Sequence, residues 1–151
     1  MRFMMIFKSN ALAEAGVMPD DALLVAMGAY NEELIKAGVM ITGEGLQASS
    51  KGARIRFTDG KPTVSEGPFP EPPERLVAGF WMIDVASKQE AIDWASRVPF
   101  AVDGSAAHNG GNGEIEIRQV FEEEDFVPHV TSDEAKAVLE AERKHRQGTG
   151  G

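Results

Sequence analysis

The ten residues 76–85, LVAGFWMIDV, form the strongest strand pattern in the chain. In an extended strand, Trp81 and Ile83 fall on one face. Phe80 and Met82 fall on the other face, so both faces are apolar. Strands of this kind are typical of the middle of a sheet, where other elements cover each side. The segment is therefore expected to be a central strand.

The N-terminal part predicts a strand, a helix and a second strand. Residues 2–8 alternate and are largely apolar on both sides. A helix is expected to begin at residues 19–21, Pro-Asp-Asp, where acids favour a helix N-terminus, and to stop at Gly38. Residues 39–42 form the second strand, and residues 9–18 are expected to be a loop. The apolar positions of the helix recur at steps of three or four: Leu23, Met27, Tyr30 and Leu34.

The middle of the chain predicts a hairpin followed by a stiff loop. Residues 53–57 alternate, and the pair at 59–60, Asp-Gly, is a strong signal for a two-residue turn that returns through residues 62–64. The turn-rich stretch 65–71, SEGPFPE, comes next. Because proline lacks a backbone donor, residues 66–75 are excluded from the middle of a sheet.

The remaining segments complete the pattern. Ser87 and Glu90 form a capping box that opens a second helix, which Pro99 ends. Residues 114–121 alternate and predict the last strand, followed by an acidic bridge at 122–128. A second capping box at Thr131 to Glu134 then opens a helix that has only three apolar positions, Ala135, Val138 and Leu139.

The predicted order is β-α-β, a hairpin insertion, β-α-β and a C-terminal helix. This order indicates an α+β protein with the ferredoxin-like split βαβ arrangement. We expect residues 1–121 to form the domain and residues 122–151 to be an acidic linker and a helix that acts as a dimer clasp or docking extension. One layer of helices covers one sheet face, so a face-to-face homodimer, forming a dimeric α+β barrel, is expected to cover the other.

Composition and charge exclude several classes of protein. The 151 residues carry a net charge of −9, which disfavours binding to nucleic acid. Cysteine is absent, which excludes disulfides, thiolate metal sites and cysteine nucleophiles. No apolar run approaches the ~20 residues that cross a bilayer, and the apolar run near the N-terminus is too short for a signal peptide. We therefore expect a cytoplasmic protein that does not bind membranes.

Several pieces of the sequence, in this order, resemble a known family. They are residues 43–46, 59–61, 66–71, 79–85, 90–95 and 114–118. Together they are similar to the YCII-related proteins, and to the subgroup whose hallmark is an Asp-Gly-Pro-Phe motif, over residues 1–121. The resemblance implies a bacterial, cytoplasmic, dimeric α+β barrel on a ferredoxin-like fold. It also implies a regulatory context, since members often accompany extracytoplasmic-function sigma factors.

The chain departs from the family pattern at three places. Glu66 stands where the hallmark has an aspartate, so the carboxylate is one methylene further from the backbone. Pro72 and Pro73 replace a Thr-Lys pair, and residues 19–37 contain no histidine. A His-Asp dyad proposed for relatives therefore does not transfer to this chain.

Three charged residues are candidates for catalysis: Glu66, Glu44 and Arg118. Glu66 beside a Gly-Pro turn suits a general acid or base or an anchor for a ligand cation, but its carboxylate also suits a structural role as an acceptor of backbone N–H groups. Glu44 lies between two glycines that permit close approach of a ligand or of another subunit. Arg118 suits a partner for either carboxylate, a carboxylate-binding group or an interface ion pair.

Four further residues are candidate ligand-binding positions: Gly67, Pro68, Phe69 and Trp81. The aromatic residues suit either the wall of an aromatic-ligand pocket or a position in the core or at an interface. Three histidines occur, at His108, His129 and His145, without the spacing of a metal site. No metal and no cofactor are expected.

The sequence is compatible with two functions. The first is a dimeric accessory module that binds a small molecule or a regulatory protein. The alternative is a metal-independent acid/base enzyme, lyase-like or isomerase-like, that acts on a small aromatic or carbonyl compound. Convergence of Glu66, Glu44 and Arg118 on an enclosed cavity would favour the enzyme.

Overall fold

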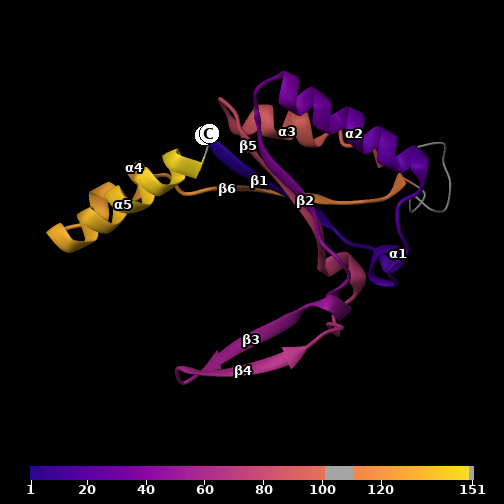
Figure 1. The fold of residues 1–151 in the computed structure, drawn as a ribbon, viewed down its shortest axis with the longest axis horizontal. Helices are drawn as coiled ribbons and strands as arrows, with labels where there is room; N and C mark the ends of the chain where they lie inside the picture. Colours follow the sequence, from indigo (N-terminus) through magenta and orange to yellow (C-terminus); the bar gives the residue numbers. More distant parts are fainter. Residues whose placement is uncertain (101–110, 150–151) are drawn as a thin grey trace.

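The computed structural model describes residues 1–100 and 111–149, and its centre is a four-stranded antiparallel sheet (Figure 1). The strand order is β2-β5-β1-β6, so β5 and β1 are central. The prediction of a central strand at 76–85 is confirmed. The strands are β1 (Arg2–Lys8), β2 (Met40–Gly45), β5 (Val77–Asp84) and β6 (Ile115–Gln119).

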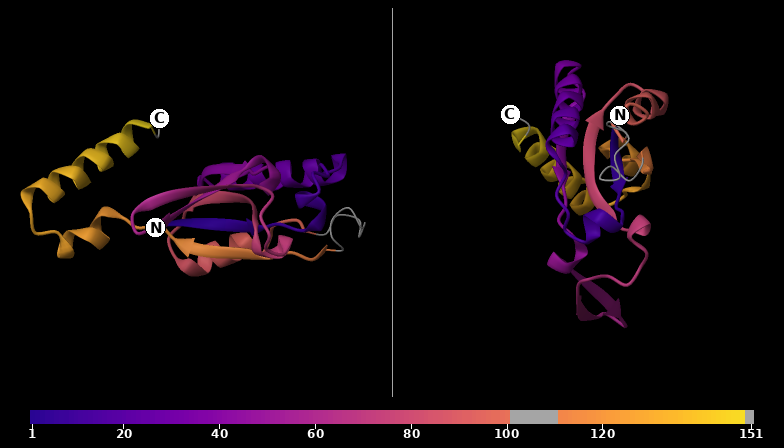
Figure 2. Two further views of the ribbon diagram at one scale, coloured as in Figure 1. Left: turned by 90° about the horizontal axis from the view of Figure 1, so that it is seen from below. Right: turned by 90° about the vertical axis from the view of Figure 1, so that its right-hand side faces the viewer.

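Two helices connect these strands and lie on one face of the sheet (Figures 1 and 2). Helix α2 (Asp21–Lys36) joins β1 to β2, and α3 (Lys88–Ala95) joins β5 to β6. The side chain of Asp20 caps α2 by accepting the N–H of Leu23 at 2.9 Å, and Ser87 caps α3. Each crossover spans one intervening strand, which confirms the ferredoxin-like split βαβ arrangement.

The core lies between the helices and the sheet. Phe3 is opposite Ile83 and Met5 is opposite Trp81 on β1 and β5, and all four side chains are buried. Helix α2 contributes Tyr30 and Leu34, two of its apolar positions at helical spacing. The alternating positions Met4, Ile6, Phe80 and Met82 therefore lie on the opposite face, which we call the open face.

The hairpin forms a separate two-stranded sheet of β3 (Ala53–Thr58) and β4 (Lys61–Glu66). Asp59 and Gly60 both have positive φ, 49° and 76°, as a type I′ turn requires. This confirms the predicted Asp-Gly turn. The hairpin extends away from the body of the protein, and most of its residues are exposed (Figure 1).

The C-terminal segment forms a second extension, which we call the tail. It contains α4 (Glu123–Phe126), a 3₁₀ turn at Val127–His129 and α5 (Asp133–Thr149). Arg143 of α5 and Glu123 of α4 form an ion pair at 3.3 Å, and no described residue of α5 is buried. The tail points away from the sheet (Figure 2).

Short helices replace parts of two segments predicted to lack them. Helix α1 (Ala11–Glu14) lies within the expected loop 9–18, because the side chain of Asn10 caps the N–H of Ala13 at 2.9 Å. Helix α4 lies within the acidic bridge, where Glu122 and Asp125 form a capping box. Most of the predicted loop before β6, with His108, lies outside the described residues.

Candidate functional site

The turn-rich loop 65–71 packs against the base of the hairpin. The N–H of Gly67 donates to the carbonyl of Gly52 at 2.9 Å, and the N–H of Phe69 donates to the hydroxyl of Ser49 at 2.9 Å. The Gly67–Pro68 peptide bond is cis. A Cβ atom at Gly67 would collide with the carbonyl oxygen of Ser49, so only glycine fits this contact.

Ser49 connects this loop to helix α1. Its hydroxyl donates to one carboxylate oxygen of Glu14, and its backbone N–H donates to the other at 2.8 Å. The same hydroxyl accepts the N–H of Phe69. Ser49 is buried, and these bonds satisfy its polar atoms. Three segments that are distant in the sequence are therefore held together at one serine.

Arg54 of the hairpin holds the other side of the loop. Its Nη1 atom donates to both carboxylate oxygens of Glu71, at 2.6 and 2.7 Å, and its guanidinium lies 3.9 Å from the centre of the Phe69 ring. The hydrogen bond from Arg54 lowers the pKa of Glu71 from its usual value. The orientation of Phe69 is therefore fixed by the guanidinium of Arg54 over its ring and by the hydrogen bond of its N–H to Ser49.

These residues border a half-open cleft, the hairpin-base cleft, with a volume of about 410 Å³. Its apolar lining includes Leu46, Phe69, Leu76 and Val77, and the rest of the lining is Glu14, Gln47, Ala48, Ser49, Lys51, Gly52, Arg54 and Arg75. Apolar walls with a few convergent polar groups are typical of small-molecule sites, whose volumes are roughly 300–1,000 Å³.

The charge of the cleft is opposite to that of the chain. In the described part of the chain, the cleft is lined by three bases, Lys51, Arg54 and Arg75, and by one acid, Glu14. Arg54 is neutralised by Glu71, whereas within residues 1–100 and 111–149 neither Lys51 nor Arg75 has an ion-pair partner. Two unpaired cations therefore remain beside the apolar wall of the cleft.

The comparison with family models assigns residues 1–123 to the YCII-related domain. The chain belongs to the YCII-related family. An uncharacterized protein of Rhizobium meliloti (strain 1021) is 33% identical over 99 residues, which is 66% of this chain and 73% of that protein. The family match ends at the start of α4, so nearly all of the tail lies beyond it.

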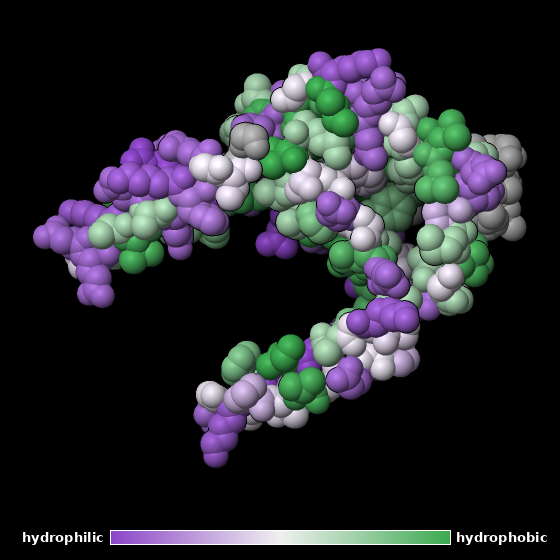
Figure 3. Space-filling model, viewed as in Figure 1, coloured by the Kyte–Doolittle hydropathy of each residue, from purple (hydrophilic) through white to green (hydrophobic). Residues whose placement is uncertain are grey.

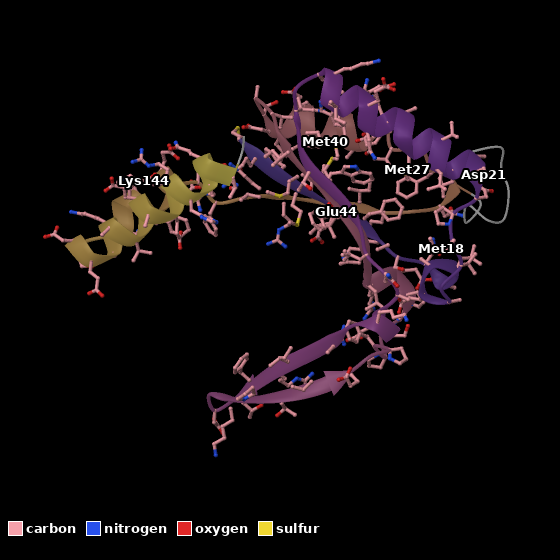
Figure 4. The ribbon with its side chains drawn as sticks, in the orientation of Figure 1. Met18, Asp21, Met27, Met40, Glu44 and Lys144 are labelled. Atoms are coloured by element: carbon pink, nitrogen blue, oxygen red, sulfur yellow. The ribbon has the colours of Figure 1, made fainter. Side chains whose placement is uncertain are left out.

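The three predicted catalytic residues of this YCII-related protein do not meet within one chain. Glu44, labelled in Figure 4, lies on edge strand β2 opposite Phe80, and Arg118 lies on the other edge strand, β6, opposite Met4. The edge strands are three strand spacings apart, roughly 14 Å. Arg118 instead lies 3.6 Å from Glu116 on its own strand, and Glu66 is exposed on β4 of the separate hairpin sheet.

The four predicted ligand-binding residues take different places. Phe69 lines the hairpin-base cleft. Gly67 anchors the loop through its hydrogen bond to Gly52, Pro68 follows it after a cis peptide bond, and neither residue lines the cleft. Trp81 is buried on the helix-covered face of the sheet, where its indole N–H donates to the side-chain oxygen of Asn31 at 2.8 Å.

Most of the cleft was not predicted. Glu14 and Arg75 lie in segments that were expected to be loops, and Ser49 and Lys51 lie between the second strand and the hairpin, where no site residue was predicted. One signal was available in the charge pattern, since residues 51–75 carry five bases and four acids in a chain whose net charge is −9. Among the described residues, no three His, Cys, Asp or Glu side chains form a possible metal site, and no helix could span a membrane.

Proposed function

We propose that this YCII-related protein is a homodimeric module that binds a small molecule in the hairpin-base cleft. The cleft itself carries the proposal, because its volume is in the range of ligand sites and one wall is an oriented aromatic ring. The hydrogen bonds of Ser49 and the ion pair of Arg54 hold this wall before a ligand arrives. Such preorganisation lowers the entropic cost of binding.

The carboxylates support binding rather than acid/base turnover. Among the residues that the structure describes, Glu14 is the one acid that lines the cleft, and both of its oxygens accept hydrogen bonds from Ser49. These bonds direct the carboxylate toward Ser49, whereas a general base must be directed at the proton that it abstracts from the substrate. Glu44 and Glu66 do not line the cleft.

Two uncovered apolar surfaces support the homodimer. The open face of the sheet presents four apolar side chains, and no helix or strand of residues 1–100 and 111–149 forms a layer over them (Figure 2). On the hairpin, Ile55 pairs with Val64 and Phe57 pairs with Pro62, so these four residues share one exposed face (Figure 3). Isolated two-stranded hairpins are marginally stable in water, so a covering surface from a second copy stabilises the hairpin.

A fluorescence titration with the neutral dye N-phenyl-1-naphthylamine tests the binding site. The variant Ala48→Trp places a large side chain in the cleft, and we expect it to weaken dye binding by about tenfold or more. Ala22→Trp, on the exposed side of α2, is the matched control and keeps wild-type affinity. Equal affinities of the two variants would contradict the site.

Native mass spectrometry of freshly purified protein tests the assembly. We expect a dimer, and any molecule that co-purifies appears as added mass that is reduced in Ala48→Trp. A monomer at all concentrations would refute the homodimer while leaving the dye titration as a separate test of the cleft.

A further inference from the structure

We propose that the ligand of the hairpin-base cleft is an organic anion, whose acidic group binds between Lys51 and Arg75 and whose apolar part lies against Phe69. This inference rests on the proposed function, and it names the class of ligand. The chemistry that it requires is a carboxylate, sulfonate or phosphate group attached to an apolar or aromatic body.

The first argument is the balance of charge. A chain with a net charge of −9 repels anions in general, so a site for an anion needs a local surplus of bases. The cleft supplies that surplus through Lys51 and Arg75, which have no acidic partner in the part of the chain that the structure describes. The carboxylate of Glu14 is turned to Ser49, where two donors bind it.

The second argument is the difference between the three bases. Arg54 has a structural role, since it binds Glu71 and stacks on Phe69. Lys51 lies on a 3₁₀ turn, Ser49–Lys51, and Arg75 ends another, Pro73–Arg75. Both side chains are exposed and border the same cleft from different segments. Two cations from separate segments suit an acidic group with several oxygens.

The third argument is the apolar wall. Leu46, Phe69, Leu76 and Val77 line the cleft together with the bases. An inorganic anion has no apolar part that could pack against this surface, whereas an amphipathic organic anion buries its apolar part there. The combination favours an organic acid over free phosphate.

A pair of related dyes tests the inference. 8-Anilinonaphthalene-1-sulfonate carries a sulfonate that N-phenyl-1-naphthylamine lacks, and the two share an aromatic framework. In Lys51→Gln/Arg75→Gln, we expect the affinity for the sulfonate dye to fall about tenfold or more, while the affinity for the neutral dye changes less than about twofold. Added NaCl weakens binding of the sulfonate dye to the wild-type protein.

Matched variants distinguish an effect of the two bases in the cleft from an effect of the net charge of the protein. Lys88→Gln/Lys136→Gln removes two exposed bases from helices outside the cleft and should leave both dyes unaffected. Lys51→Arg/Arg75→Lys keeps the charges and should retain the sulfonate dye. Inorganic phosphate should displace the sulfonate dye more weakly than benzoate does, because phosphate leaves the apolar wall uncovered.

The outcomes are distinguishable. If Lys51→Gln/Arg75→Gln affects both dyes equally or neither, or if phosphate competes as well as benzoate, the organic-anion inference is overturned and the cleft remains a site for the neutral dye. If Ala48→Trp changes the affinity of neither dye, the proposed function fails together with this inference.

Discussion

The two sheets of this YCII-related protein differ in what covers them. In the four-stranded sheet, Phe3, Met5 and Ile83 are almost fully inaccessible because α2 and α3 pack over one face. In the hairpin, Ile55 and Phe57 alternate in the same way, yet they are 55% and 69% exposed. The same period-2 pattern therefore produces a core in one place and an uncovered surface in the other.

The covered sheet stabilises the fold, whereas the exposed hairpin is available for contacts with other molecules. Burial of apolar side chains is the main favourable contribution to folding, so the helix-covered face supplies most of the stability. The hairpin contributes little to that core and is held at its base by the loop 65–71. The hairpin-base cleft lies where the two sheets meet, next to a rigid body and an exposed arm.

The largest effect is expected in the covered sheet. Leu34→Ala removes a side chain with no exposed surface and should lower the free energy of unfolding by about 2–5 kcal/mol. Leu24→Ala, on the same helix but 57% exposed, is the matched control and should cost less than about 0.5 kcal/mol. Urea denaturation measures both. Similar losses in the two variants would mean that α2 does not form the core described.

The next effect concerns the junction of the sheets. Gly67→Ala forces a methyl group into the carbonyl of Ser49, and we expect a loss of about 1–3 kcal/mol with weaker binding of N-phenyl-1-naphthylamine. Gly45→Ala is the control, because a Cβ atom there meets no atom within 4 Å. Urea denaturation and dye titration report the two effects. The packing of the loop would be refuted if Gly67→Ala kept both stability and affinity.

Local patterns predicted the elements of the fold because their physical causes are local. Apolar alternation in residues 76–85, the cap at Ser87 and the Asp-Gly turn each act within a few residues. The short helices α1 and α4 were missed, since four residues carry too little periodic signal. The C-terminal helix that the capping box at residues 131–134 predicted is present as α5 (Asp133–Thr149).

The candidate site was harder to predict because long-range contacts create it. Phe69 was identified as a ligand-binding residue and lines the cleft, but its position depends on Ser49, which is 20 residues away in the chain. Ser49 in turn depends on Glu14, which is 35 residues away. No local pattern encodes these long-range contacts, whereas Glu66 belongs to a local motif and lies outside the cleft.

A smaller effect is expected for Tyr30, the one tyrosine of the chain. Its hydroxyl donates to the carbonyl of Trp94 at 2.9 Å, and burial raises its pKa to about 12 from 10.0. Tyr30→Phe should cost about 1 kcal/mol by leaving this carbonyl without its donor. Urea denaturation at neutral pH measures the cost.

The same tyrosine predicts a response to alkali. Because the pKa is higher in the folded state, the stability that neutral Tyr30 contributes is complete below pH 10.0 and is lost as the pH rises toward about 12. Tyr30→Phe should lose less stability than the wild-type protein in this range. Tyrosinate absorbance of the folded protein reports the pKa, and a midpoint near 10.0 would contradict burial of the hydroxyl.

The smallest effect on the stability of a single chain is expected in the uncovered hairpin. Phe57→Asp changes an exposed residue, so the free energy of unfolding of a monomer should change by less than about 0.5 kcal/mol. If a second copy covers this face, the same variant buries an unpaired carboxylate and should dissociate the dimer in sedimentation velocity. Thr63→Asp adds the same charge to the opposite face of the hairpin, since Thr63 pairs with Arg56, and should remain dimeric. If both variants dissociate, the added charge causes the effect. If neither variant dissociates, the hairpin is not part of the dimer interface, and the open face is then the apolar surface of that interface.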